Sequence, residues 1–394
     1  MQKKSFFIGF ALGLLIMIGA VVGYNAYERH FIWGGEPSPN EKVREMYSIV
    51  TRNAAVEFDW AEMIDNMYRG FLAGIGDPYT QYLNEEALEA FQVRTEGVFV
   101  GIGVRVYMDL NDDTLTLATV FSGSPAAEAG LMPGDKIIAV DGVGVVGRIQ
   151  QEILSKITGE AGTVVNLEIY RPYENIHFDV NITRRQITVP TVFHEMIETD
   201  EGLTGYVRIV SFERPTYSQF VDAIEELLSQ GMDSLIVDVR NNPGGLLNVV
   251  SDITNMLIPE GVIVSLEYGS GERYVREANN SYLGLPLVVL INGRSASASE
   301  VLSGAVRDTG VGILVGEQTF GKGIVQTIFN LSGGAGMKLT TALYFTPSGA
   351  FIHDVGIEPD FLVEMEESRS RRIGDLPFEE DIQLQVALRA LRQR

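Results

Sequence analysis

The sequence predicts an α/β (α+β) fold, in which a layered sheet-and-helix domain follows a compact β-rich module. After about residue 187, strand-like runs alternate with amphipathic helical runs, a pattern typical of helices packed on a sheet. Before that point, short strand-like runs are separated by Gly- and Pro-containing turns and by two short helical runs. We therefore expect five regions: an apolar N-terminal segment at 1–27, a small helical unit at 38–90, a β-rich module at 91–185, the α/β domain at 186–365 and a C-terminal helix at 366–394.

The first region is an apolar run from Phe6 to about Tyr24, preceded by Lys3 and Lys4. Roughly 17–25 apolar residues are enough for a helix to span a bilayer, and positive charge in front of such a run favours export of the chain after it. We expect an uncleaved transmembrane helix that leaves the rest of the chain outside the cytoplasm, in a bacterial-type cell envelope. The alternative is a secretory signal peptide, cleaved near residues 21–23, which would make the protein secreted.

Composition narrows the possible functions. The 394 residues include no cysteine, which excludes thiol catalysis and zinc–thiolate sites. The net charge of -22 argues against nucleic acid as a partner, because phosphate contacts require stripes of Lys and Arg. We expect no metal and no cofactor. The acidic excess should keep the protein soluble, and it should repel acidic peptide tails while tolerating basic or apolar ones.

The helical unit is expected to contain two helices. Asn40 is the predicted N-cap of the first, and the second is predicted to begin at Asp59. The segment GDPYTQYL, residues 76–83, breaks the helical pattern with Asp-Pro. This unit and the C-terminal helix could together support a homodimer.

The α/β domain is predicted from strand-like runs that alternate with helical runs. Strands are expected in TGYVRIVSF, SLIVDVRNNPGG, PLVVLI and VGILVGE, and helices in YSQFVDAIEELLSQGM, LLNVVSDITNML and ASEVLSGAVRD. MKLTTALYFTPSG is predicted to add an edge strand. DIQLQVALRALRQR is predicted to form a final helix that packs on the body or on a partner.

The segment GEQTFGKGIVQ, residues 316–326, nearly matches the phosphate-binding loop G-x-x-x-x-G-K-[ST]. Gly323 stands where that loop requires a hydroxyl, and the β-branched residues after it predict a strand where the loop requires a helix. We interpret Lys322 as a desolvated general base, because burial favours the neutral amine. The usual base is histidine, but none of the four has an obvious Asp-oriented setting: His30, His177, His194 and His353.

A nucleophile for this base is expected at the turn NGRSASASE, between an apolar strand and a helix. The turn holds Ser295, Ser297 and Ser299, and a serine at such a turn is exposed close to helix amides. The alternative is a capping loop, since serine caps helices and Glu300 would favour the first turn. Spacing alone does not choose among the three serines.

GRSASASE followed by VGEQTFGKGIVQ resembles the signature pair of the carboxyl-terminal processing peptidases, or tail-specific proteases. These are exported serine peptidases with a Ser-Lys dyad. GDPYTQYL resembles the family's pre-PDZ motif, and GIGV with SPAAEAGLMPGDKIIAVDG resembles its PDZ domain. GYVRIVSF, DVRNNPGG and GIEPD resemble its protease core. The resemblance implies that 91–185 is a PDZ-like domain and that 186–365 is a Ser-Lys protease core.

By motif position, the resemblance implies that Ser297 is the nucleophile, Lys322 the general base and Gln326 the residue that holds the lysine. It implies an extracytoplasmic serine endopeptidase that recognises C-terminal tails of proteins through its PDZ domain and cleaves through an acyl-enzyme. The alternative is a catalytically silent PDZ scaffold of the same family. Two further sets of backbone amides are implied: an oxyanion hole from Ala298 with Gly244 or Gly245, and a peptide-carboxylate site at Gly101, Ile102 and Gly103.

Overall fold

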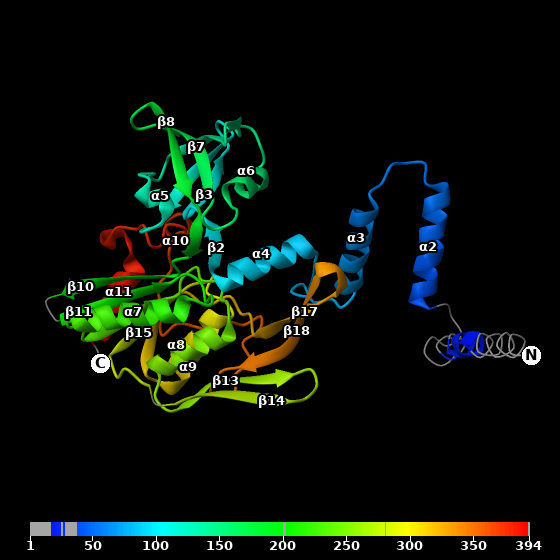
Figure 1. Cartoon of the computed structure of the whole chain (residues 1–394). Coiled ribbons are helices and arrows are strands. Elements are labelled where there is room, and N and C mark those ends of the chain that lie inside the picture. The colour runs from blue at the N-terminus through cyan, green and yellow to red at the C-terminus, as the bar shows by residue number, and fades with distance from the viewer. Residues whose placement is uncertain (1–16, 25–26, 28–37, 200–201, 280, 393–394) are drawn as a thin grey trace, which may run out of the picture. The chain divides into compact units, whose positions relative to one another are not determined.

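The computed structural model describes residues 17–24, 27, 38–199, 202–279 and 281–392 (Figure 1). The predicted anchor falls largely on residues 1–16, outside the described residues. Within the described ranges, we find no helix that combines the length and apolar character needed to cross a membrane. Contacts divide the chain into two compact units, 1–68 and 69–394, and the division falls inside helix α3 (Trp60–Ala73).

The first unit contains helix α2 (Pro39–Asn53) and the start of α3. The prediction that Asn40 caps α2 is wrong by two residues, because Ser38 forms a capping box with Glu41 and Pro39 occupies the first helical position. The second helix begins at Trp60, one residue after the predicted start. The assignment of 38–90 as one dimerising unit stays a prediction.

The β-rich module has its own sheet and its own apolar core. The strand order is β3-β4-β5-β7-β8, with β6 paired to β5, so β3 lies at an edge. A separate two-stranded ladder pairs the entry of the module with its exit (Figure 1). The elements are β2 (Val98–Gly101), β3 (Val104–Asp109), β4 (Thr114–Val120), α5 (Pro125–Glu128), β5 (Lys136–Val140), β6 (Val143–Gly144), α6 (Gln150–Ile157), β7 (Val164–Arg171), β8 (Ile176–Thr183) and β9 (Arg185–Thr188).

The α/β domain contains a six-stranded sheet of order β10-β11-β12-β15-β16-β19, parallel except for β10. Alternate side chains of its central strands enter two cores on opposite faces, as the period of a strand requires. One core includes α7, α8 and α9, and the other includes the C-terminal helix α11, which packs on the body as one of the two predictions stated. The bounds are β10 (Val192–Thr199), β11 (Gly202–Ile209), α7 (Thr216–Ser229), β12 (Ser234–Asp238), α8 (Leu247–Leu257), β15 (Leu287–Ile291), α9 (Ala298–Thr309), β16 (Gly312–Gly316), β19 (Phe361–Leu362), α10 (Glu367–Ser370), the 3-10 helix η3 (Phe378–Glu380) and α11 (Ile382–Leu391).

A second, five-stranded sheet corrects one prediction. The segment expected as an edge strand forms β18, which lies inside this sheet: β1 and β13 pair with it along one side and β17 along the other. Its mostly half-buried side chains fit an edge strand equally well, and its partners come from distant segments. The hairpin β13–β14 was not predicted. The elements are β1 (Gln81–Leu83), α4 (Glu85–Glu96), β13 (Gly261–Tyr268), β14 (Arg273–Ala278), β17 (Ile324–Asn330), the 3-10 helix η2 (Ser332–Gly334) and β18 (Gly336–Phe345).

Candidate active site

The candidate site begins at the carboxyl ends of two adjacent parallel strands, β12 and β15. Each strand is followed by a turn that leads into a helix, the arrangement in which open α/β sheets place their ligand sites. The fully buried Asn242 joins the two turns, because its carbonyl oxygen accepts the N–H of Ala296 at 3.0 Å and the hydroxyl of Ser299 at 2.9 Å. The NNPGG turn and the serine-rich turn therefore form one connected structure.

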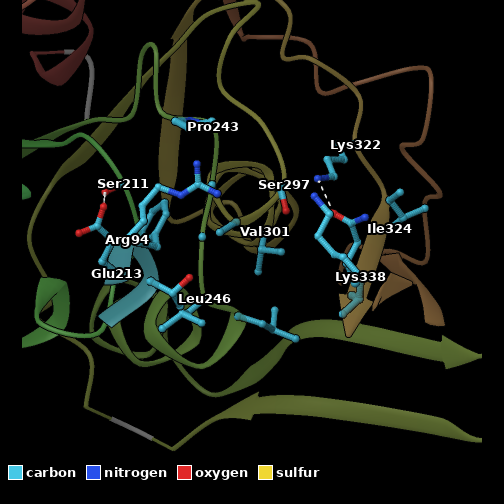
Figure 2. A pocket seen from close by; sticks show the side chains of 18 of the residues that line it. Arg94, Ser211, Glu213, Pro243, Leu246, Ser297, Val301, Lys322, Ile324 and Lys338 are labelled. Atoms are coloured by element: carbon cyan, nitrogen blue, oxygen red, sulfur yellow. Dashed lines mark hydrogen bonds between the residues drawn. The ribbon is translucent and has the colours of Figure 1, made fainter. Parts of the chain in front are cut away.

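The structure separates the three candidate serines. Ser295 is fully buried, and its hydroxyl donates to the carbonyl oxygen of Val239 at 2.8 Å. Ser299 is also fully buried and donates to Asn242. Ser297 is half-buried and lines a pocket (Figure 2). Only the middle serine thus presents its side chain to a space that a substrate can enter.

The backbone of Ser297 is strained. Its φ of 55° and ψ of -111° lie outside the regions that L-residues favour. Such conformations persist only where surrounding structure holds them, and they cluster at functional sites. Here Tyr344 donates its hydroxyl to the Ser297 carbonyl oxygen at 3.1 Å, and Glu300 accepts the Ser297 N–H at 2.8 Å. The strain places the hydroxyl at the entry of α9, close to the first free amides of that helix.

Glu300 connects the serine turn to the loop that carries the lysine. Its carboxylate is fully buried and accepts four hydrogen bonds. The donors are the Ser297 N–H at 2.8 Å, the Thr319 hydroxyl at 2.7 Å, the Gly321 N–H at 2.7 Å and the Lys322 N–H at 2.9 Å. The sequence predicted only a favourable charge in the first helical turn, although the S-x-x-E capping-box pattern was a visible signal.

Lys322 enters the same pocket from the opposite wall (Figure 2). Its ammonium group donates to Gln326 Oε1 at 3.1 Å and lies 4.8 Å from the centroid of the Tyr79 ring. Burial lowers the pKa of Lys322, and the like charge of Lys338 lowers it further. Two carboxylates, Asp77 and Glu300, act in the opposite direction. The neutral amine, which can accept a proton, is therefore favoured relative to an exposed lysine.

Gln326 links the lysine to a segment from the other end of the chain. Its Oε1 faces Lys322, and its Nε2 donates to the carbonyl oxygen of Tyr79 at 2.5 Å. Asp77 holds that segment, accepting the Thr80 and Thr340 hydroxyls at 2.6 Å each. GDPYTQYL was predicted only as a helix break and a family motif, so its contact with the lysine was missed, and spacing along the chain carries no signal for it.

Two backbone amides beside Ser297 donate no hydrogen bond within the described residues, those of Ala298 and Gly245. The Gly244 amide, in contrast, donates to Asn242 Oδ1 at 2.9 Å. Gly244 has a φ of 104°, and a Cβ there would lie 2.8 Å from the Ser297 Cβ. Glycine is thus required at 244 for close approach, while the free amide that was expected at 244 or 245 belongs to Gly245.

A pocket of about 530 Å³ opens in front of these groups. Its walls are largely apolar, and its polar lining includes Arg94, Glu213 and Lys338 (Figure 2). The apolar walls are formed by side chains from the turn after β12, from the start of α8, from α9 and from β17: Leu246, Leu247, Val301, Ile324 and Ile328. The pocket can hold an extended peptide segment with an apolar side chain near Ser297.

The predicted carboxylate-binding loop lies in the β-rich module, away from this pocket's lining. Gly101 belongs to β2 and pairs with Arg185 of β9. The amides of Ile102 and Gly103 donate no hydrogen bond within the part of the chain that the structure describes. A Cβ at Gly103, whose φ is 83°, would lie 2.3 Å from the Ser124 Cβ. Two of the three predicted amides are thus available, next to the unpaired edge of β3.

Comparisons with known proteins identify two family models and several relatives that are similar to this chain. The model of Peptidase family S41 matches residues 203–363, and that of the PDZ domain matches 118–171. A carboxyl-terminal-processing protease of Synechocystis is 37% identical over 80% of this chain and 74% of its own. The carboxy-terminal processing protease CtpA of Bacillus subtilis is 34% identical over 82% and 69%. A solved photosystem II D1 C-terminal processing protease is 31% identical over 87% of this chain and 92% of its own, with a TM-score of 0.49.

The first of these relatives is matched over most of both chains at an identity that establishes kinship. The β-rich module accordingly is a PDZ domain, and the α/β domain with its second sheet is the peptidase part. The chain belongs to peptidase family S41, among the carboxyl-terminal processing proteases, and is a serine peptidase.

Proposed function

We propose that this protein is a serine endopeptidase in which Ser297 and Lys322 form a catalytic dyad. The observation that carries the proposal is the shared pocket: the one serine of the turn that faces it lies opposite a half-buried lysine whose pKa is lowered by its partial burial. Gln326 and the Tyr79 ring hold the lysine amine, and Glu300 fixes both backbones. Gln326 therefore acts as a positioning residue for the base.

The chemistry follows from these roles. Neutral Lys322 takes the proton from Ser297 Oγ, which attacks the scissile carbonyl carbon. The oxygen of the tetrahedral intermediate accepts hydrogen bonds from the amides of Ala298 and Gly245. The C–N bond then breaks, the leaving amine takes the proton from Lys322, and an ester to Ser297 remains. Water attacks this acyl-enzyme, with Lys322 again accepting the proton, and releases the new carboxyl terminus.

The PDZ domain supplies the proposed selection of substrates by their C-terminal tails. A tail adding to the free edge of β3 would place its carboxylate at the loop of Gly101, Ile102 and Gly103, whose last two amides are available. We further propose that segment 1–27 anchors the protein in a membrane with the peptidase outside the cytoplasm, or is cleaved to release it. A homodimer through 38–90 and the C-terminal helix completes the proposal.

The test is cleavage of casein, an unfolded substrate, without ATP or metal. Wild type should cut it, and Ser297→Ala and Lys322→Ala, each checked for folding by circular dichroism, should not. Equal cutting by both variants would refute the dyad. Binding of a peptide tail without any Ser297-dependent cleavage would favour the silent PDZ scaffold.

If wild type is inactive, a gated enzyme must be distinguished from a silent one. Gly101 and Arg185 are paired neighbours, so residues 102–184 can be replaced by a short Gly-Gly turn with little rearrangement of the ladder. A domain that restrains the peptidase should give increased casein cleavage when it is removed. A folded deletion variant that stays inactive would point to the scaffold.

A further inference from the structure

Besides the catalytic lysine, the pocket contains two cationic side chains with no role in the proposed dyad. Arg94 comes from α4 and Lys338 from β18, and Figure 2 shows both side chains directed into the pocket. Lys338 is half-buried. Within the described residues, neither side chain has a carboxylate partner inside 4.0 Å, and neither donates a hydrogen bond.

Lys338 lies in the electrostatic field of Arg94. Burial lowers the pKa of Lys338, the positive charge of Arg94 lowers it further, and the negative charge of Asp77 acts in the opposite direction. Folding therefore places the exposed cation Arg94 near the half-buried cation Lys338, and within the described residues no carboxylate forms an ion pair with either of them. A buried or half-buried charge is normally paired, so this arrangement lacks the counter-ion that a bound substrate can supply.

The carboxylates nearby do not supply that counter-ion. Glu213 lines the pocket and accepts the hydroxyl of Ser211 at 2.8 Å. Arg94 acts on the pKa of Glu213 through its charge, but the two side chains lie beyond ion-pair distance. Asp77 is engaged by three donors of its own segment and of β18. Glu300 is fully buried behind the serine turn. The pocket is thus locally cationic in a chain whose net charge is -22.

We propose that Arg94 and Lys338 form a subsite that binds a carboxylate of the peptide substrate beside the scissile bond. This inference rests on the proposed function and reverses, for the pocket itself, the expectation that acidic tails are repelled. The guanidinium offers planar paired donors and the ammonium a point charge, a combination suited to one carboxylate. The carboxylate is either an acidic side chain or the terminal carboxylate of a short tail.

The test uses a peptide cut from casein by wild type, identified by mass spectrometry and resynthesised with Glu or Gln at each of three positions on either side of the bond. Each peptide is made with a free and with an amidated C-terminus. At one of these positions, kcat/KM should be about tenfold higher for the Glu peptide than for the Gln peptide, or it should be about tenfold higher for the free than for the amidated C-terminus. That ratio should approach one in Lys338→Gln, fall in Arg94→Gln and invert in Lys338→Glu.

Ratios between paired peptides cancel any effect of Lys338 on the base Lys322. The matched control is Arg273→Gln, which removes an exposed cation of β14 and should leave the ratio unchanged. A side-chain preference identifies an acidic residue, and a preference for the free terminus identifies a short tail. A terminus preference that persists in Lys338→Gln belongs to the PDZ domain and overturns the subsite, as does an unchanged ratio in both pocket variants.

Failure of the proposed dyad can be distinguished from failure of the proposed subsite. If cleavage does not depend on Ser297, fluorescently labelled Glu and Gln forms of one casein peptide are used in a binding assay with the Ser297→Ala protein. Preferential binding of the Glu form that is lost on adding Lys338→Gln supports the subsite without the dyad. Equal binding of both forms overturns it. Should Lys338→Gln fold poorly, Lys338→Arg and the exposed Arg94→Gln decide the same question.

Discussion

Replacing Glu300 with glutamine perturbs the single group that holds both halves of the proposed dyad. The side chain keeps its shape and loses its charge. In the native structure its two oxygens accept four hydrogen bonds, from the amides of Ser297, Gly321 and Lys322 and from the hydroxyl of Thr319. The site is fully buried, so no water can replace a lost acceptor. Each of the four donors must therefore bond to the glutamine side chain or stay without a partner.

The magnitude follows from counting donors. The glutamine oxygen can keep the amides of Ser297 and Lys322, which leaves its NH₂ group facing Thr319 and Gly321. The Thr319 hydroxyl can rotate and accept a hydrogen bond from the glutamine NH₂ group. The Gly321 amide cannot, because it is itself a donor, so it is left without an acceptor. An unsatisfied buried donor costs roughly 1–3 kcal/mol, and losing charge assistance in the other bonds adds about 1–2 kcal/mol. The expected destabilisation is therefore about 2–5 kcal/mol.

The assay is kcat/KM on a casein-derived peptide, together with the urea midpoint of the peptidase part. A shift of the dyad by about 1 Å should lower kcat roughly 100-fold. The control is Glu317→Gln, since Glu317 accepts one hydrogen bond, from the Met365 amide, and should cost much less. Glu300 raises the pKa of Lys322, so loss of its charge alone would favour the neutral base and increase activity near neutral pH. Activity and midpoint equal to wild type, or increased activity, would refute the positioning role.

Three further predictions concern the base, its ring contact and the C-terminal helix. Because Lys322 must be neutral to act as a base, kcat/KM should rise as the pH passes through its lowered pKa. Lys338→Gln removes a like charge, so it should raise the pKa of Lys322 and move this rise to higher pH. An unchanged pH profile in that variant would contradict the prediction. Tyr79→Leu should lower kcat/KM about 3- to 30-fold and Tyr79→Phe much less, since the ring rather than the hydroxyl faces the ammonium; equal losses in peptide assays would argue against the contact. Asp381→Ala should cost about 3–5 kcal/mol in urea unfolding, because it removes one of the two carboxylates paired with the fully buried Arg240, and a midpoint like that of wild type would show that Asp238 suffices.

The local elements could be predicted because each depends on neighbours along the chain. The continuous apolar runs became buried parallel strands, and the β-branched run after Gly323 became β17 where a nucleotide-binding loop requires a helix. Errors arose where local signals were nearly equivalent. Ser38 and Asn40 both suit an N-cap, and Pro39 decided between them. The mixed polar and apolar run of β18 fits an edge strand and an inner strand of a half-exposed sheet equally well.

By itself, the sequence determined the class of chemistry: a serine turn, a lysine between glycines, no cysteine, and a family resemblance that the comparisons support. The family resemblance pointed to Ser297 by motif position, and the tertiary structure gave the physical reason, because burial and bonds to distant carbonyl groups engage Ser295 and Ser299. The tertiary structure alone placed Tyr79 against a glutamine 247 residues away and surrounded Glu300 with donors from two loops. Such contacts depend on sheet register and packing between remote segments, which the periodicity of one segment does not encode.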